Sequence, residues 1–333
     1  MILPGDDPRA RARALQCLQD GALVGLPTET VYGLAADACN DAAVARIFAA
    51  KGRPADHPLI VHVADAQAAH AFAAEVPDFA AALMQAFWPG PLTLILPRRA
   101  GVAEAAAGGQ PTVGLRCPDH PVAQALLQAC RAAQPPMSGL AAPSANLFGR
   151  VSPTRAAHVQ EEFGPDLLVL DGGPCQVGIE STIVDCTRGL PVLLRPGVLT
   201  PERLSAACGQ KVLLKEELPS QMGQGPKASG TLESHYAPRA RVRLVDQAAL
   251  GQSDAAPAQS AGRLALYARQ LPPAGAGRLL RRMPDTPQAA AHDLFAALRE
   301  LDAAGATDIW VEQPPPGSDW DGVRDRLSRA AAR

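Results

Sequence analysis

Residues 22–63 read ALVGLPTETVYGLAADACNDAAVARIFAAKGRPADHPLIVHV, a pattern of short apolar runs separated by polar turns. Val44, Ile47 and Phe48 recur at the spacing of one helical face, which predicts a helix in the middle of the stretch. The apolar runs on either side are typical of strands in a sheet. The predicted elements, in order, are a strand at 22–26, a strand at 32–34, a helix at 41–50 and a strand at 59–63.

Polar side chains stand at the ends of these predicted strands. Thr28 and Thr30 follow the first strand, Lys51 and Arg53 surround a glycine before the last, and His62 alternates with two valines inside it. Ligand sites in α/β sheets usually lie where neighbouring strands end. Because hydroxyls, cations and an imidazole gather there, we expect a binding site at this edge of the sheet.

The composition is that of a globular chain. Its 333 residues are enough for two domains of ordinary size. Apolar residues make up 47% and charged residues 19%, so a substantial core can form and wholesale disorder is excluded. The net charge of −2 argues against a dominant electrostatic grip on nucleic acid, although a local basic cleft stays open.

The cysteines and the apolar segments bear on the compartment. Seven cysteines are spread along the chain without a C-x-x-C pair, which argues against a disulfide framework or a structural zinc site. Residues 1–16 contain no apolar segment, and no run of 18 apolar residues occurs in the sequence. We therefore expect a cytoplasmic protein without membrane association.

The pattern changes twice after residue 212, which predicts three parts. Residues 1–212 mix hairpin-like and crossover connections, so we expect a twisted mixed α/β sheet with helices. Residues 213–240 are rich in Gly, Pro and Ser and are typical of a linker. Residues 241–333 predict a small Rossmann-like α/β domain, without the G-x-G-x-x-G that would support dinucleotide binding. Other predicted elements are helices at 8–20, 64–75, 78–87, 120–133, 200–208, 288–304 and 320–331, and strands at 92–96, 111–116, 167–170, 181–185, 193–197, 241–245, 263–267, 279–283 and 308–312.

Four cations stand at the end of a predicted strand or just before one, beside Gly or Pro. They are Lys51, Arg53, Arg116 and Arg195. Guanidinium groups pair well with phosphate and carboxylate oxygens. A solvated surface charge explains any one of the four by itself, but the four together favour a shared anion site.

Small polar turns supply further hydrogen-bonding groups. Ser144 and Asn146 follow a proline, and Ser181 and Thr182 open a predicted strand. Hydroxyls and backbone N–H groups in such turns bind carboxylate or phosphate. Ser152 has a simpler explanation as the N-cap of a helix that begins at the following proline.

The linker contains an aromatic–imidazole pair, His235 and Tyr236, which a mere tether would not need. The chain has no P-loop, no H-E-x-x-H and no G-x-S-x-G, and no residue stands out as a covalent nucleophile. If the protein uses ATP, it binds the nucleotide without a P-loop.

In their order and spacing, nine segments resemble the long, two-domain form of the threonylcarbamoyl-AMP synthase family, whose catalytic domain is of the YrdC type. The resemblance covers roughly residues 8–238, and the last domain is similar in position and predicted class. It implies a YrdC-like twisted α/β sheet with a concave, positively charged face. The segments are PTETVYGL (27–34), KGRPADHPLIVHV (51–63), WPGPLT (88–93), TVGLRCP (112–118), APSAN (142–146), SPT (152–154), GIESTIVD (178–185), LLRPG (193–197) and SHYAP (234–238).

The resemblance implies a nucleotidyltransferase that condenses L-threonine, bicarbonate and ATP into threonylcarbamoyl-AMP and pyrophosphate. The product would pass to proteins that transfer the threonylcarbamoyl group to tRNA beside the anticodon, and a weak contact with tRNA itself is compatible with this role. Mg²⁺ would be held mainly by the triphosphate. Threonine would be held by Thr30, His62, Arg116, the backbone of Ala142, Ser181 and Thr182. ATP would be held by Lys51, Arg53, His57, Ser144, Ser152, Arg195 and Tyr236, with Thr112 and Asn146 near the nucleotide, and Lys51 and Arg53 would act in catalysis.

This chemistry is consistent with the residues, because adenylation needs positioning and charge stabilisation more than acid–base groups. The linker with Tyr236 would then serve as a lid that excludes water. Two alternatives stay open. One is an RNA-binding or ribosome-associated module that performs no catalysis. The other is a carbamoyl transferase like the YrdC-like domains of hydrogenase-maturation proteins, whose zinc-finger and acylphosphatase-like segments are not found in this sequence.

Overall fold

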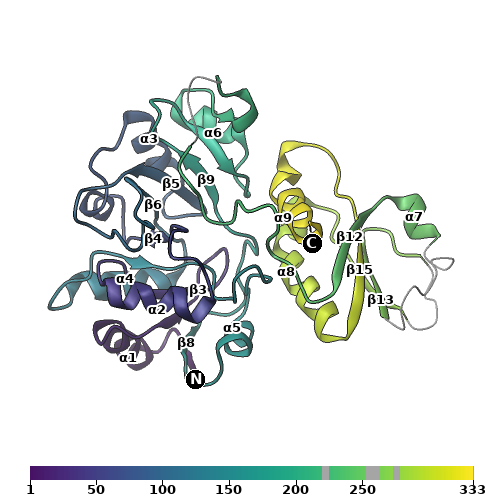
Figure 1. Cartoon of the computed structure of the whole chain (residues 1–333), viewed down its shortest axis with the longest axis horizontal. Coiled ribbons are helices and arrows are strands. Elements are labelled where there is room, and N and C mark those ends of the chain that lie inside the picture. The colour runs from purple at the N-terminus through teal and green to yellow at the C-terminus, as the bar shows by residue number, and fades with distance from the viewer. Residues whose placement is uncertain (220–224, 253–262, 273–277, 333) are drawn as a thin grey trace.

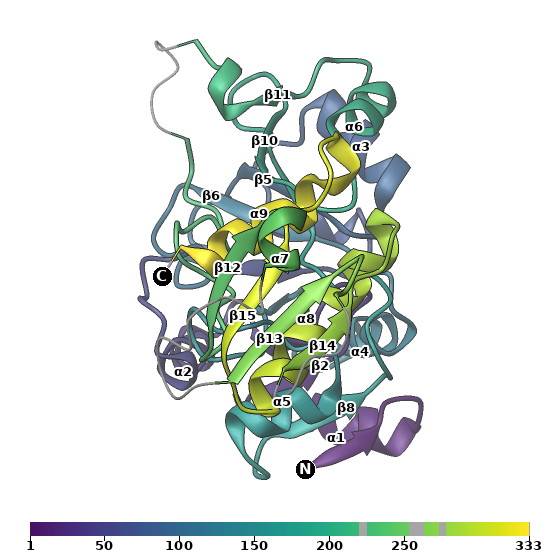
Figure 2. The ribbon, with the colours of Figure 1, turned by 90° about the vertical axis from the view of Figure 1, so that its right-hand side faces the viewer.

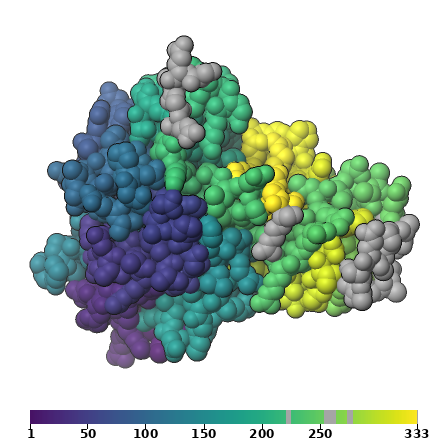
Figure 3. Space-filling model, viewed as in Figure 1, coloured from purple at the N-terminus to yellow at the C-terminus, as the bar shows by residue number. Residues whose placement is uncertain are grey.

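The computed structural model describes residues 1–219, 225–252, 263–272 and 278–332. Among these residues the strands form two sheets, one of eleven strands and one of four. Each sheet belongs to its own lobe, and the two lobes are in contact (Figures 1 and 3). The predicted fold class, a mixed α/β sheet followed by a smaller α/β unit, is confirmed.

The large sheet contains β1 (Ile2–Pro4), β2 (Val24–Leu26), β3 (Gly33–Asp37), β4 (Ile60–His62), β5 (Leu92–Pro97), β6 (Thr112–Arg116), β7 (Leu140–Ala141), β8 (Leu168–Asp171), β9 (Thr182–Asp185), β10 (Val192–Arg195) and β11 (Leu213–Leu214). Its order is β1-β8-β2-β3-β7-β4-β6-β5-β9-β10-β11. β4 and β6 pair in parallel with His62 opposite Arg116. Val61 and Val63 pack in the main core while His62 lines a pocket, as their alternation predicted.

The helices of the large domain are α1 (Pro8–Gln19), α2 (Asp41–Lys51), α3 (Asp78–Phe87), α4 (Pro121–Ala132), α5 (Ala156–Phe163) and α6 (Pro201–Cys208), with short 3-10 helices η1 (Ala68–Ala71) and η2 (Lys215–Glu217). α2 begins after Asn40, whose side chain accepts a hydrogen bond from the amide of Ala43 (3.1 Å). It ends at Lys51, because Gly52 adopts a left-handed φ of 62° and turns the chain toward Arg53. Across the described residues, we find no helix with the length and apolar character of a transmembrane span.

The helix predicted at 64–75 is wrong, because only η1 forms there. The side chain of Asp65 caps the amide of Ala68 (2.7 Å), which starts a single short turn. The chain then leaves the helical path, and the amide of Ala74 donates to the carbonyl of Pro97 at the end of β5 (2.8 Å). Pairing with a neighbouring segment thus overrides the helical propensity of an alanine-rich sequence.

The small domain holds β12 (Arg241–Val245), β13 (Arg263–Ala268), β14 (Leu279–Arg282) and β15 (Ala306–Glu312), with α7 (Gln247–Gly251), α8 (Pro287–Ala303), η4 (Ser318–Trp320) and α9 (Asp321–Ala331). The sheet order is β12-β15-β13-β14, and all three pairs are parallel. α8 and α9 lie on the side of this sheet that faces the large domain, whereas α7 lies beyond the sheet on the far side (Figures 1 and 2).

The core of the small domain continues into the large one. Val31, Val151 and Ile179 of the large domain are buried in the same apolar cluster as Phe295 of α8, and Tyr236 of the linker joins them. A contact between domains that shares a dry core favours one fixed arrangement over free movement. The shared cluster therefore holds the small domain, the linker and the large domain in one fixed arrangement.

Candidate active site

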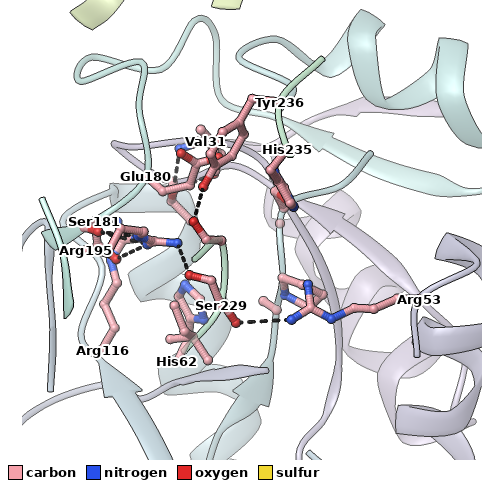
Figure 4. Close-up of a pocket in the computed structure, with 17 residues that line it drawn as sticks. Val31, Arg53, His62, Arg116, Glu180, Ser181, Arg195, Ser229, His235 and Tyr236 are labelled. Atoms are coloured by element: carbon pink, nitrogen blue, oxygen red, sulfur yellow. Dashed lines mark hydrogen bonds between the residues drawn. The ribbon is translucent and has the colours of Figure 1, made fainter. Parts of the chain in front are cut away.

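A pocket lies where the ends of β4, β6, β9 and β10 meet the linker (Figure 4). Its volume is about 40 Å³. That is enough for a few water molecules and far below the roughly 300–1,000 Å³ typical of ligand pockets. The linker residues Ser229, Gly230, His235 and Tyr236 form one of its walls, so the pocket is closed in this arrangement.

The residues predicted to bind ligand fall into three groups. Eight line the pocket: Arg53, His62, Arg116, Ala142, Ser144, Ser181, Arg195 and Tyr236. Five are buried among the segments that carry these eight: Thr30, Lys51, Asn146, Ser152 and Thr182. Two lie apart from the pocket lining. His57 packs its ring edge-on against Phe148 (5.7 Å between centroids), and Thr112 faces a neighbouring depression lined by Lys227 and Ser229.

Arg195 and Arg53 face the linker across the pocket. The Nε and Nη2 atoms of Arg195 donate to the carbonyl of Ser181 (3.0 and 2.8 Å), and Nη2 also reaches the Ser181 hydroxyl (3.1 Å). Its Nη1 donates to the carbonyl of Ser229 (2.9 Å). Arg53 donates to the carbonyl of Pro58 (2.9 Å) and to Ser229 Oγ (3.4 Å). Both guanidinium groups therefore hold oxygen atoms of the linker.

Lys51 is fully buried at the end of α2. Its Nζ donates to the carbonyls of Ser144 (2.6 Å) and Asn146, so the ammonium fixes the turn that carries both residues. Burial, with the neighbouring charge of Arg53, lowers the pKa of Lys51 to about 7. A change in charge near Lys51 can thus change its protonation at neutral pH.

A buried ion pair lies behind His62. Nη2 of Arg116 is 2.6 Å from Oε1 of Glu29, and each side chain is 4% exposed. Burial, followed by the charge of Arg116, lowers the pKa of His62 to about 3, so its imidazole is neutral at pH 7. Sequence reasoning did not single out Glu29 as the partner of Arg116, although its place between Thr28 and Thr30 in a polar cluster was a usable signal.

Ser152 is not the N-cap that the sequence suggested. α5 begins at Ala156 after Arg155, and the buried Ser152 hydroxyl donates to Oε1 of Glu180 instead. Burial alone would raise the pKa of Glu180, but Arg326 and Arg195 outweigh it and hold this pKa below its usual value. A hydrogen bond from the Ser152 hydroxyl to a buried carboxylate is stronger than a neutral hydrogen bond to a backbone amide in a helix cap. Ser152 and Glu180 are far apart in the chain, and the sequence gives no indication that they pair.

The linker closes over the pocket through several contacts. Lys227 bonds the large domain at both ends, its amide with Gln110 Oε1 (2.9 Å) and its ammonium with Asp56 (2.6 Å). Tyr236 adopts a left-handed φ of 61°, and its hydroxyl lies 3.5 Å from the carbonyl of Gly230. Burial, with the charge of Glu180, raises the pKa of Tyr236 to about 12, so the phenol is neutral and can donate.

This arrangement can bind an anion and exclude water. Cations and hydroxyls converge on one pocket, and the linker covers it. Among residues 1–219, 225–252, 263–272 and 278–332, no group of three His, Cys, Asp or Glu side chains is placed to hold a metal ion. The chemistry that these groups support is charge stabilisation and positioning.

Comparisons with known proteins agree along the whole chain. A family model described as "Telomere recombination" matches residues 16–197, and one described as "Threonylcarbamoyl-AMP synthase, C-terminal domain" matches residues 199–332. Threonylcarbamoyl-AMP synthase of Pyrococcus abyssi is 38% identical over 94% of this chain and 92% of its own length. The Bacillus subtilis enzyme of the same name is 42% identical over 73% of this chain and 68% of its own length.

Solved structures give the same result. The crystal structure of P. abyssi Sua5 complexed with L-threonine superposes with a TM-score of 0.87, at 35% identity and covering 99% of this chain and 97% of that one. A second structure of that protein, in which an adjacent His and Tyr are both replaced by Ala, superposes with a TM-score of 0.85 at 34% identity.

Proposed function

Because the chain belongs to the threonylcarbamoyl-AMP synthase family, we propose that it condenses L-threonine, bicarbonate and ATP into threonylcarbamoyl-AMP and pyrophosphate. This reaction makes it a nucleotidyltransferase. The observation that carries the proposal is one closed pocket in which Arg53, Arg195 and Arg116 converge with Ser181 and a neutral His62. The product would serve proteins that transfer the threonylcarbamoyl group to tRNA, and a weak direct contact with tRNA is compatible with it.

Threonine is assigned to the end of the pocket at β4 and β6. Arg116 would pair with its carboxylate. His62 and the hydroxyls of Thr30, Ser181 and Thr182 would hydrogen-bond the rest of the amino acid, together with the backbone of Ala142. A neutral His62 suits this role, because an imidazolium would repel the ammonium group of the incoming amino acid.

ATP is assigned to the side where Arg53 and Arg195 meet the linker. These two cations now hold oxygens of Ser229, so the linker must move before a triphosphate can take its place. Ser144 lines the pocket on this side, with Lys51, Asn146 and Ser152 buried behind it, and Tyr236 would close over the nucleotide. His57 and Thr112 lie farther out and are assigned to outer contacts. Mg²⁺ would be carried mainly by the phosphate oxygens.

The reaction then proceeds in two bond-forming steps. The threonine ammonium first loses a proton to water, and the free amine then attacks carbon dioxide with loss of a second proton, or bicarbonate with loss of water, which gives a carbamate. A carbamate oxygen attacks the α-phosphorus of ATP, and pyrophosphate leaves. Negative charge builds on phosphate oxygens between Arg53, Lys51 and Arg195, which is where cations lower the barrier.

The experiment is product formation with ATP, Mg²⁺, bicarbonate and threonine, each omitted in turn. Mass spectrometry would detect threonylcarbamoyl-AMP, and a coupled assay would detect pyrophosphate. We expect product only when all three substrates are present, with serine a poor replacement for threonine. Bound nucleotide without product would contradict the proposal and favour carbamoyl transfer or RNA binding.

The residue assignment has its own test. Arg53→Ala and Arg195→Ala should each lower kcat/KM by at least about 10²-fold, since each removes a charge from the phosphate site. Arg282→Ala, which removes an exposed arginine of the small domain, is the matched control and should change nothing. Activity close to that of the wild type in both pocket variants would refute the assignment.

A further inference from the structure

One guanidinium of the small domain enters the large domain behind the pocket. The side chain of Arg326, on α9, is 0% exposed. Its Nε donates to Glu180 Oε2 (2.8 Å) and its Nη2 to the carbonyl of Glu180 (3.2 Å). Its Nη1 donates to the carbonyl of Pro196 (2.8 Å) and to Asp325 (2.7 Å). A planar guanidinium with three engaged nitrogens holds its partners in one relative orientation.

The partners of Arg326 are the neighbours of two pocket residues. Glu180 precedes Ser181 in the chain, and Pro196 follows Arg195. Arg195 in turn donates to the carbonyl of Ser181. The segments that carry Ser181 and Arg195 are therefore joined twice, once by Arg195 inside the pocket and once by Arg326 behind it.

The same carboxylate extends the contact to a third pocket segment. Glu180 accepts from Arg326 with one oxygen and from the Ser152 hydroxyl with the other. Arg299 of α8 strengthens this segment, because it donates to the carbonyl of Val151 and forms an ion pair with Glu162 (2.9 Å).

Close packing fixes the position of α9. A Cβ atom at Gly322 would lie 2.8 Å from the carbonyl oxygen of Gly197 and 2.8 Å from Ile179. At Gly178, where φ is +83°, a Cβ atom would lie 2.5 Å from the backbone of His292 in α8. The small domain thus approaches the 178–181 and 195–197 segments with no room for a side chain at either glycine.

α9 also contacts the linker. The guanidinium of Arg326 lies 5.3 Å from the ring centroid of Tyr236, and the carbonyl of Arg329 accepts from the amide of His235 (3.2 Å). α9 therefore fixes the positions of the segments that carry Ser181 and Arg195, and also contacts His235 and Tyr236, the two linker residues that close the pocket.

We propose that Arg326 is a positioning residue for the synthase reaction, supplied by the C-terminal domain to hold Ser181, Arg195 and Ser152 in their working geometry beneath the closed linker. The inference rests on the proposed function and assigns the small domain a part in it. That domain does more than anchor the linker, because it sets the geometry of the ATP site.

The test compares Arg326→Met with Arg324→Met. Arg324 lies on the same helix, and its partners among the described residues are Pro315, Gly317 and Asp321 of its own domain, so it is the matched control. We expect Arg326→Met to lower kcat/KM for ATP by about 10²-fold, the loss that a misplacement of about 1 Å can cause, and to weaken binding of a non-hydrolysable ATP analogue. Arg326→Lys, which keeps the charge without the planar fork, should recover only part of this loss.

Analogue affinity keeps this test separate from the test of the function. If the wild type binds the analogue but makes no threonylcarbamoyl-AMP, the proposed function fails, and the Arg326 inference is still decided by affinity. A folded Arg326→Met variant that melts at a lower temperature but keeps the wild-type kcat, KM and analogue affinity within twofold would overturn the inference.

Gly322→Ala decides the question if Arg326→Met does not fold. This change keeps Arg326 and introduces a residue with a higher helix propensity than glycine. It also pushes α9 away from Gly197. We expect a folded variant with at least a tenfold loss of kcat/KM for ATP, and unchanged kinetics and affinity would refute the inference.

Discussion

Glu29 and Arg116 form an ion pair in which each charge is stabilised by the other, since both side chains are almost fully buried. Removing one partner of such a pair leaves an unpaired charge in the interior, which costs about 3–5 kcal/mol. We therefore expect Glu29→Gln to lower the free energy of unfolding by about that amount in urea titrations. Glu104→Gln, which removes an exposed carboxylate 3.6 Å from Arg98, should cost less than about 1 kcal/mol. Equal effects in the two variants would show that the buried pair has no special weight.

His62 predicts a pH dependence of stability. Its pKa falls to about 3 in the folded chain because of burial and the charge of Arg116, whereas an unfolded histidine titrates near 6.5. The unfolded state therefore binds the extra proton first, so stability is lost as the pH falls from about 6.5 toward 3. The contribution is about 1.4 kcal/mol per pH unit. His62→Gln should reduce the slope of the unfolding free energy against pH by this amount between pH 6 and 5. His70→Gln, which replaces an exposed histidine, should leave that slope as it is in the wild type. Parallel slopes in all three proteins would contradict the burial of a neutral His62.

The residues that sequence reasoning found and those that it missed differ in how their partners are placed. Arg53, His62 and Ser144 stand at strand ends or in turns beside Gly or Pro, so local pattern pointed to them. Glu180 and Arg326 owe their importance to a contact between residues 146 positions apart, joined only by the docking of two domains. The local sequence pattern does not reveal pairs of residues that lie so far apart in the chain. For this reason Ser152 was predicted to cap a helix, whereas its hydroxyl donates to Glu180.

At the scale of elements, prediction succeeded where periodicity was strong and failed where pairing decided. The helix expected at 41–50 corresponds to α2, and the strands expected at 241–245 and 279–283 correspond to β12 and β14. The helix expected at 64–75 was lost because Ala73 and Ala74 pair with the end of β5. A short sequence segment does not show which strand elsewhere in the chain will form hydrogen bonds with its backbone.

Gly230 allows the linker to close. Its φ is +71°, and a Cβ atom there would lie 2.2 Å from the hydroxyl of Tyr236 and 2.9 Å from Arg195. Gly230→Ala should therefore hold the linker off the pocket, raise hydrogen exchange at residues 229–236 and lower kcat/KM for ATP by at least tenfold. Gly209→Ala is the matched control, because φ is +69° and a Cβ atom would meet nothing within 4 Å. It should cost only the backbone strain, about 1 kcal/mol of stability, with activity kept. Equal activity in both variants would mean that closure of the linker does not limit the reaction.

At the scale of the whole molecule, the two domains share one apolar cluster. Val31, Val151 and Ile179 from the large domain pack with Phe295 from the small one, and Arg326 crosses the same boundary. Separating the domains would expose this apolar surface and break the ion pair between Arg326 and Glu180. Both costs oppose an intermediate in which one domain is folded alone.

We therefore expect the chain to unfold in one cooperative transition, unusual for its length. Trp88 lies in the large domain, and Trp310 and Trp320 lie in the small one, so each domain can report separately. One variant, Trp88→Phe, keeps the small-domain signal, and a second, Trp310→Phe with Trp320→Phe, keeps the large-domain signal. Within each variant, the fluorescence and circular dichroism midpoints in urea should coincide. Adding Gly322→Ala should separate them, because it pushes α9 away from Gly197 and Ile179 and so weakens the contact between the domains. Two distinct transitions without that change would show that the shared cluster does not couple the domains, and would weaken the case that the small domain sets the geometry of the pocket.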